Sequence, residues 1–242
     1  MTSKILIYGG SGGIGCATAR ALRERGYDLH LVGRDAEKLT AVAREIEATY
    51  TLGDVADGGL FARAVQDAGD QLAGLVYAVG TINLKSLQRL TEADFLDDFR
   101  VNALGAALAV QAAAPALKKA PDGAAVVLFS SVAVRQGFAF HASIGMAKGA
   151  VEGLTLSLAA ELAPKVRVNA IAPSLTRTKL AAGLLANEQT AAAIAGQHAL
   201  QRLGDPADIA ALAAFLISPD AAWITGQIIG VDGGRASLRA KG

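Results

Sequence analysis

The sequence has very few of the residues that build metal centres and disulfide frameworks. Its 242 residues include one cysteine, Cys16, and three histidines that lie far apart in the chain: His30, His141 and His198. A single thiol forms neither an internal disulfide nor a multi-thiolate zinc site, and isolated histidines do not provide the clustered ligands of a metal enzyme. The sequence therefore predicts a fold without disulfides and a function without a bound metal.

An excess of charge of one sign is also missing. Lys and Arg number 23 and Asp and Glu number 22, which gives a formal charge of +1, and the basic residues form no stripe. Nucleic-acid binding needs a local excess of positive charge. We therefore expect no nucleic-acid partner.

Long hydrophobic runs are absent too. The most apolar long stretch, 101–117, is interrupted by Asn102, Gln111 and Pro115, and it is shorter than the ~20 apolar residues of a membrane-spanning helix. After Lys4 only four apolar residues precede a glycine cluster, whereas a secretory signal needs about 7 to 15. We therefore expect a cytoplasmic protein that does not interact with a membrane.

The hydrophobic residues, 52% of the chain, follow a regular alternation. Short runs with apolar residues at consecutive positions are typical of parallel strands covered on both faces, and the amphipathic stretches between them are typical of helices. The alternation predicts a single domain over 1–242, a Rossmann-like, doubly wound parallel α/β sheet of about seven strands with helices on both faces. The predicted strands are 4–8, 28–32, 48–52, 74–79, 124–130, 166–172 and 227–231, and the predicted helices include 14–25, 36–47, 95–120, 143–163 and 206–218.

A glycine-rich loop follows the first predicted strand and opens the first predicted helix. Gly9, Gly13 and Gly15 fit the pattern G-x-x-x-G-x-G, in which a tight turn lets backbone N–H groups approach a pyrophosphate at the helix N-terminus. A flexible surface turn has a similar composition, so the motif alone is weak. Its position in a βαβ unit favours a dinucleotide site.

The end of the second predicted strand indicates which dinucleotide is bound. An acidic residue there would hydrogen-bond the adenine-ribose hydroxyls of NAD, but the sequence has Gly33 followed by Arg34. A guanidinium clamps a phosphate through charge-assisted hydrogen bonds. The sequence therefore favours NADP over NAD, and the alternative is a solvated arginine paired with Asp35 or Glu37.

Three further segments carry a resemblance to a known family. They are Thr-Gly-Gln-Ile-Ile-Gly-Val-Asp-Gly-Gly at 225–234, Arg-Val-Asn-Ala-Ile-Ala-Pro-Ser at 167–174 and Leu-Gly-Asp-Val at 52–55. Together with the glycine loop, they make the chain resemble the short-chain dehydrogenase/reductase family over nearly its whole length. The resemblance implies a nicotinamide cofactor, with Asp54 at the adenine amino group, and extends the predicted cofactor site to Ser11, Ile14, Val55, Gly80, Pro173 and Thr178.

The resemblance also implies the catalytic groups, with one exception. Ser131 would polarise the substrate carbonyl, Lys148 would hold the nicotinamide ribose, and Asn102 would support a water chain to that lysine. The family's catalytic tyrosine lies four residues before the lysine and about thirteen after the serine, and both counts end at Ile144. No tyrosine occurs between 138 and 153, so a shift of register does not restore it.

Two smaller departures from the family pattern lie at neighbouring strand ends. Tyr-Ala-Val-Gly at 77–80 replaces Asn-Asn-Ala-Gly, and Ser174 follows Pro173 where the family usually has glycine. The first change removes the family's asparagine side chains from this part of the site, although Gly80 is retained.

His141 is the nearest candidate to replace the missing tyrosine. On a helix, positions 141, 144 and 148 share one face, and imidazole exchanges protons near neutral pH. The alternative is that His141 caps the helix or packs against Phe138 and Phe140. Three other candidates are weaker, because each has an ordinary explanation. Ser143 is expected to cap the helix, Cys16 to pack against the sheet, and Tyr77 to lie beside the adenosine.

Two functions are compatible with these residues. The first is an NADP-dependent oxidoreductase that transfers hydride between the nicotinamide and a small, apolar carbonyl, alcohol or imine substrate, with His141 as an atypical proton donor. The alternative is a catalytically silent NADP(H)-binding sensor or partner subunit. The long segment 174–203 is expected to form either a substrate lid or surface helices. The resemblance further implies a homo-oligomer, either a tetramer or a dimer.

Overall fold

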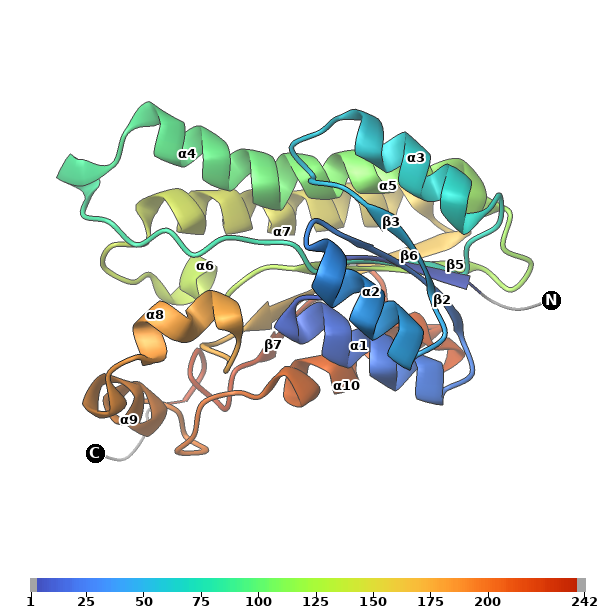
Figure 1. Ribbon diagram of the computed structural model, residues 1–242. Helices are drawn as coiled ribbons and strands as arrows, with labels where there is room; N and C mark the ends of the chain where they lie inside the picture. The colour runs from blue at the N-terminus through green and yellow to red at the C-terminus, as the bar shows by residue number, and fades with distance from the viewer. Residues whose placement is uncertain (1–3, 239–242) are drawn as a thin grey trace.

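The computed structural model describes residues 4–238 of the chain. Its centre is a seven-stranded parallel sheet in the order β3-β2-β1-β4-β5-β6-β7 (Figure 1), which confirms the predicted fold class. The ends of the predicted domain, 1–3 and 239–242, lie outside the described residues. The strands are β1 (Lys4–Tyr8), β2 (Asp28–Gly33), β3 (Thr49–Leu52), β4 (Gly74–Tyr77), β5 (Ala124–Phe129), β6 (Val166–Pro173) and β7 (Ile228–Val231).

The runs of consecutive apolar residues form strands that are buried on both faces. Every residue of β4 and β5 is buried. The strand order changes direction between β1 and β4, which pair in parallel. In a doubly wound sheet this reversal opens a crevice at the carboxyl ends of the strands. The topology therefore places the ligand site beyond the ends of β1 and β4.

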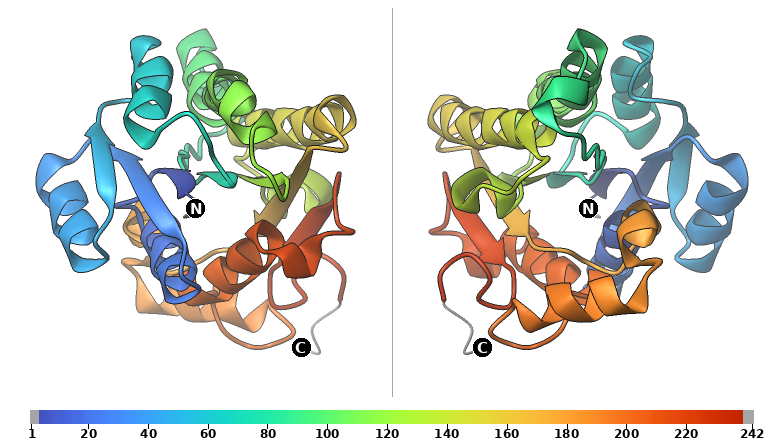
Figure 2. Two further views of the ribbon diagram at one scale, coloured as in Figure 1. Left: turned by 90° about the vertical axis from the view of Figure 1, so that its right-hand side faces the viewer. Right: turned by 90° about the vertical axis from the view of Figure 1, so that its left-hand side faces the viewer.

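Helices cover the sheet in two layers (Figure 2), and each layer forms its own apolar core with the strand residues that face it. Leu6 and Tyr8 of β1 belong to one core, and Ile5 and Ile7 belong to the other, as the two-residue period of a strand requires. On one face lie α1 (Gly13–Glu24), α2 (Ala36–Glu45) and α10 (Pro206–Ile217), and on the other lie α3 (Gly59–Ala68), α5 (Gly105–Lys118) and α7 (Ala142–Leu162).

The long helix predicted for 95–120 is interrupted, which corrects that prediction. α4 (Glu92–Phe99) and α5 are joined by a π-helical turn, η2 (Arg100–Leu104), an irregularity that is frequent at functional sites. The hydroxyl of Tyr77 donates a hydrogen bond to the carbonyl oxygen of Val101 in this turn (2.7 Å). Tyr77 is only 2% exposed, so it supports the turn and is not available to an adenosine as the sequence had suggested.

The segment 174–203 forms short helices beyond the carboxyl ends of the strands. These are η3 (Lys179–Ala181), α8 (Ala182–Leu185) and α9 (Glu188–Gly196). In Figure 1, α8 and α9 lie at the same end of the sheet as the short helix α6 (Ala133–Gln136). Among residues 4–238, no helix combines the length and the apolar character that crossing a membrane requires.

Candidate active site

The glycine loop between β1 and α1 is packed so closely that side chains have no room. Gly9 has a φ of +76°, and a Cβ there would lie 2.6 Å from the carbonyl oxygen of Ala78. A Cβ at Gly13 would lie 2.8 Å from the Cγ2 atom of Thr178, and one at Gly15 would overlap the carbonyl oxygen of Gly9. Gly9 and Gly15 are therefore required by the backbone and Gly13 by the side chain of Thr178 packed against it, as expected for a loop that leaves a helix N-terminus open to a pyrophosphate.

Cations lie beside this open helix N-terminus. Gly13 and Thr178 border a hollow together with Arg177 and Lys179. The N-terminal end of α1, which carries the positive end of the helix dipole, and two basic residues thus border one hollow, and one of them, Arg177, also lies 3.9 Å from Oδ1 of Asp205. This arrangement fits the phosphates of a dinucleotide.

The predicted adenosine end of the site is built around Arg34. This side chain is 82% exposed, and its Nη1 atom lies 3.5 Å from Oδ2 of Asp54. Arg34 is solvent-exposed, as the alternative required, but among residues 4–238 its ion pair is with Asp54 and not with Asp35 or Glu37, and Asp35 instead contacts Lys38. Arg34 and Asp54, predicted separately from two strand ends, are therefore neighbours.

The remaining residues predicted at this end have modest structural roles. A Cβ at Gly33 would lie 3.1 Å from the Oγ atom of Ser11, so the serine occupies the space beside the strand end. Val55 is half-buried and packs against the core that contains Leu60. Neither contact conflicts with the predicted cofactor site.

A pocket of about 350 Å³ lies at the carboxyl ends of β4, β5 and β6, beside the start of α1. Four residues from the predicted catalytic part of the site border it: Ser131, His141, Ile144 and Lys148. Four predicted cofactor-site residues border it as well: Ile14, Gly80, Pro173 and Thr178. The tertiary structure thus brings the substrate and nicotinamide parts of the predicted site together.

Lys148 is held in the pocket wall by a single hydrogen bond within the described residues. Its Nζ atom donates to the carbonyl oxygen of Phe129 (2.9 Å). Burial lowers the pKa of Lys148 to about 8, and the negative charge of Asp98 partly opposes this shift. The amine is therefore charged at neutral pH and loses its proton at mildly alkaline pH.

Asn102 lies behind the pocket, in the π-helical turn. Its Nδ2 atom donates to Thr81 Oγ1 and to the carbonyl oxygen of Asp98, both at 2.8 Å. Its Oδ1 atom is buried and has no hydrogen-bond partner among residues 4–238. A Cβ at Gly80 would lie 3.0 Å from this oxygen and 3.4 Å from Lys148 Nζ. The free acceptor therefore faces the space beside the lysine, where it fits the predicted role in a water chain.

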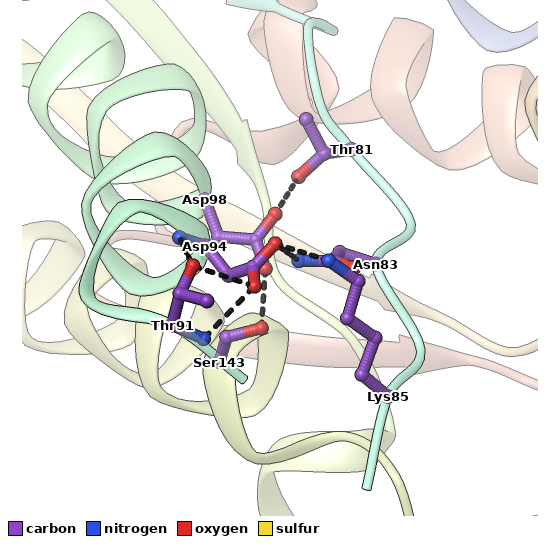
Figure 3. A network of polar contacts seen from close by, with 7 residues as sticks. All are labelled: Thr81, Asn83, Lys85, Thr91, Asp94, Asp98 and Ser143. Carbon is purple, nitrogen blue, oxygen red and sulfur yellow. Dashed lines mark hydrogen bonds and ion pairs between the residues drawn. The ribbon is translucent and has the colours of Figure 1, made fainter. Parts of the chain in front are cut away.

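A buried carboxylate that the sequence did not single out lies next to these groups (Figure 3). Asp98 is 2% exposed, and it accepts hydrogen bonds from the hydroxyls of Thr81 and Ser143, both at 2.6 Å. Ser143 therefore does not cap α7 as predicted, and His141 occupies the N-cap position. Nothing local in the sequence marks Asp98, because its two partners, Thr81 and Ser143, come from two other segments of the chain.

A second polar cluster lies beside the first. Asp94 accepts hydrogen bonds from Lys85 (2.6 Å) and Asn83 (3.2 Å), and forms a capping box with Thr91 at the start of α4 (Figure 3). These contacts hold the loop that follows β4 against α4. They fix the backbone that carries Gly80 and Thr81 into the pocket.

His141 has a defined orientation at the pocket. Its Nδ1 atom donates to the carbonyl oxygen of Ala139 (2.7 Å), and its ring meets the ring of Phe138 edge-on at 5.3 Å between centroids. A carbonyl only accepts, so in the neutral ring Nδ1 carries the hydrogen and Nε2 is the free acceptor. The predicted packing against Phe138 and the predicted access to the pocket are both present.

Two other candidates are not suited to chemistry in the pocket. Burial raises the pKa of the Cys16 thiol, which disfavours the reactive thiolate. His198 donates from Nδ1 to the carbonyl oxygen of Ile194 (2.8 Å), and its Nε2 atom lies 2.8 Å from Ser174 Oγ. Through these two hydrogen bonds, the buried imidazole connects the end of α9 to the residue that follows β6. Among residues 4–238, no cluster of His, Cys, Asp and Glu could hold a metal ion.

Comparisons with known proteins agree with this geometry. Residues 9–236 match the family model described as enoyl-(acyl carrier protein) reductase. Carbonyl reductase family member 4 of Danio rerio is 33% identical over 97% of this chain and 98% of its own length. The chain therefore belongs to the short-chain dehydrogenase/reductase family of oxidoreductases.

Solved structures show the same relationship. A short-chain type dehydrogenase/reductase from Mycobacterium ulcerans superposes with a TM-score of 0.92 at 30% identity, covering 98% of this chain and 91% of that one. ElxO with NADP bound superposes with a TM-score of 0.90 at 28% identity, covering 98% of this chain and 100% of that one. Structural neighbours thus include an NADP complex.

Proposed function

We propose that the protein is an NADP-dependent oxidoreductase that transfers a hydride between the nicotinamide and a small carbonyl, alcohol or imine substrate. One observation carries the proposal: Ser131, His141 and Lys148 border a single pocket together with Ile14 of the glycine-loop helix. A protein that used the fold only for contact with a partner would not need these polar groups around one cavity.

The binding roles follow from position and charge. Lys148 holds the nicotinamide ribose, Asn102 supports it, and Ser131 hydrogen-bonds the substrate oxygen. Arg34 contacts the 2′-phosphate that distinguishes NADP from NAD, because its guanidinium is exposed at the end of β2. When bound, the cofactor would supply or accept the hydride.

The proton requires a group other than residue 144. Ile144 is buried in the pocket wall, and its side chain carries no exchangeable proton. In our proposal, the imidazolium form of His141, which keeps the Nδ1–H bond to Ala139, donates the Nε2 proton to the substrate oxygen during reduction and becomes neutral, and the neutral ring accepts that proton at Nε2 during oxidation. A positioned general acid contributes about 10²- to 10⁴-fold in rate, so this group decides whether ketones are reduced at a useful rate.

Imines form a second substrate class for the same site. An iminium already carries its positive charge, so hydride addition creates no alkoxide that needs a proton. The pocket walls are largely apolar, with side chains that include Ile82, Leu84 and Leu180, and accept a small hydrophobic body. An apolar wall at position 144 would be tolerated in such a reaction.

A silent NADP(H)-binding sensor is the alternative, and the observation that favours it is Ile144. The oxidoreductase would transfer hydride to or from a substrate, whereas the sensor would bind NADP(H) without any transfer. We would incubate the protein with NADPH deuterated at either face of C4 and with a panel of matched ketones and imines, and follow deuterium into the product. Transfer from one face only is expected. NADPH binding without transfer to any ketone or imine, and without the reverse transfer from alcohols, would identify the sensor.

The role of His141 is tested by His141→Ala. We expect kcat for ketones to fall about 100-fold while the Kd for NADPH, measured by fluorescence titration, stays unchanged. Phe140→Ala is the matched control, because Phe140 is the exposed neighbour in the same loop. Equal losses in both variants would show that the loop, and not the imidazole, matters.

A further inference from the structure

Arg235 brings a cation to the pocket from the segment that follows β7. The side chain is half-buried and borders the pocket. Its guanidinium carbon lies 5.1 Å from the centre of the Phe138 ring, and its Nη1 atom donates to the carbonyl oxygen of Gln197 (3.4 Å). Stacking on an aromatic face fixes the planar group and leaves most of its N–H donors free.

The charge of Arg235 is not neutralised within residues 4–238, where it forms no ion pair. Arg202 shows the contrast, because Asp208 holds it through two hydrogen bonds of 2.6 and 2.8 Å. A half-buried guanidinium without a carboxylate partner is costly unless a ligand provides one. Arg235 is therefore available to an anion.

The rest of the pocket has the same electrostatic character. The described residues that line it include no aspartate or glutamate, whereas Lys148, Arg235 and His141 are basic. Most of the other lining side chains are apolar, among them Leu84, Ile144 and Ile194. Low-polarity walls strengthen the field of the cations. The pocket thus attracts a negatively charged group.

The cofactor phosphates do not account for Arg235. Arg177 and Lys179 border the separate hollow beside Gly13, at the N-terminus of α1. Arg235 instead contacts Phe138 and Gln197, on the side of the pocket that His141 borders. Its position is therefore that of a substrate-binding residue.

We propose that Arg235 binds a carboxylate of the substrate, so that the substrate class is a small oxo acid, or the corresponding hydroxy acid, with an apolar body. The planar guanidinium fork matches a carboxylate through two parallel hydrogen bonds. This inference rests on the proposed oxidoreductase function. In the reduction, hydride adds to the carbonyl carbon, the proton from His141 adds to the carbonyl oxygen, and the carboxylate is unchanged.

The test compares straight-chain oxo acids of several lengths, such as 4-oxopentanoate, with their methyl esters. For each pair we would measure kcat/KM with NADPH and, separately, binding to the NADP-saturated protein by calorimetry. The wild type is expected to prefer the acids. Arg235→Gln should reduce that preference about 10- to 100-fold without changing the ester values or the NADPH Kd.

Two further variants sharpen the test. Arg235→Lys keeps the charge but loses the planar fork, so an intermediate preference is expected. Arg89→Gln removes an exposed arginine of η1 (Leu87–Arg89) that does not border the pocket, and it should leave the preference unchanged.

The outcomes separate this inference from the function on which it rests. Equal binding and turnover of acids and esters by the wild type, or equal losses for both in Arg235→Gln, would overturn the role of Arg235 while leaving hydride transfer intact. Conversely, acid binding that depends on Arg235 without any hydride transfer would support the carboxylate site and reject the oxidoreductase.

Discussion

The two ends of the site differ in what holds their residues in place. At the cofactor end, Gly9 and Gly15 are required because the backbone leaves no space for a Cβ, and a Cβ at Gly13 would meet the side chain of Thr178. At the substrate end, Ile144 is buried in the pocket wall and Arg235 contributes a cation that forms no ion pair among residues 4–238. The difference teaches that the cofactor end is constrained by the backbone, whereas the chemistry of the substrate end depends on individual side chains.

The largest effect is expected from a change at the cofactor end. Gly15→Ala would place a methyl group against the carbonyl oxygen of Gly9, and the loop would have to move away from the helix N-terminus. We expect the NADPH Kd to rise at least about 100-fold, which corresponds to about 2.7 kcal/mol. Fluorescence titration measures this change.

Gly58→Ala is the control for that variant, because a Cβ at Gly58 meets no atom within 4 Å. It should bind NADPH as the wild type does. Wild-type affinity in Gly15→Ala would show that the close packing of the loop is not needed for binding, and the contrast between the two ends would lose its basis.

The next largest effect is expected at the substrate end, from introducing a tyrosine at position 144, where the spacing from Ser131 and Lys148 predicts the family's tyrosine. Ile144→Tyr provides a phenol that Lys148, on the same face of α7, would activate. We expect kcat for ketones to rise about 10- to 100-fold and His141→Ala to have little further effect in this background. Steady-state kinetics of the two single variants and the double variant test this expectation. An undiminished effect of His141→Ala would mean that the two groups serve different steps.

The smallest effect is expected on the pH dependence of NADPH affinity, which the buried charges of Lys148 and Asp98 govern. Burial lowers the pKa of Lys148 to about 8 and the charge of Asp98 opposes this shift, so the ammonium form is lost as the pH rises through about 8. NADPH affinity should fall by up to about 10-fold over this range, measured by titration between pH 6 and 10. Lys148→Arg should remove the pH dependence, because arginine keeps its proton.

Asp98→Asn sharpens this prediction. Without the negative charge the pKa of Lys148 falls further, so the loss of NADPH affinity should begin at a lower pH than in the wild type. The amide oxygen still accepts a hydrogen bond from one of the two hydroxyls, of Thr81 or Ser143, and the amide N–H group donates to the oxygen of the other, which keeps the cluster together. Ser143→Ala removes one of these bonds but no charge, and it should leave the midpoint unchanged. An identical midpoint in Asp98→Asn and the wild type would contradict the coupling.

Much of the fold and part of the site could be predicted from local patterns. The strand runs, the glycine motif and the counts that lead from Lys148 and Ser131 to Ile144 are all properties of short stretches of sequence. The interruption at Arg100–Leu104 was missed because each side of it has helical composition. The cap of α7 was missed because the hydroxyl of Ser143 finds a stronger partner in Asp98 than in the backbone.

The sequence by itself determined the parallel sheet, the glycine loop and the isoleucine at position 144, where the spacing from Ser131 and Lys148 predicts the family's tyrosine. Hydrophobic periodicity and backbone-imposed glycines are encoded locally, so they can be identified without coordinates. Only the tertiary structure decided that Asp98 meets Ser143, 45 residues away in the chain, and that Arg235 stacks on Phe138 at the pocket. Such contacts depend on which helices and strand ends the sheet brings together, and no local pattern records them.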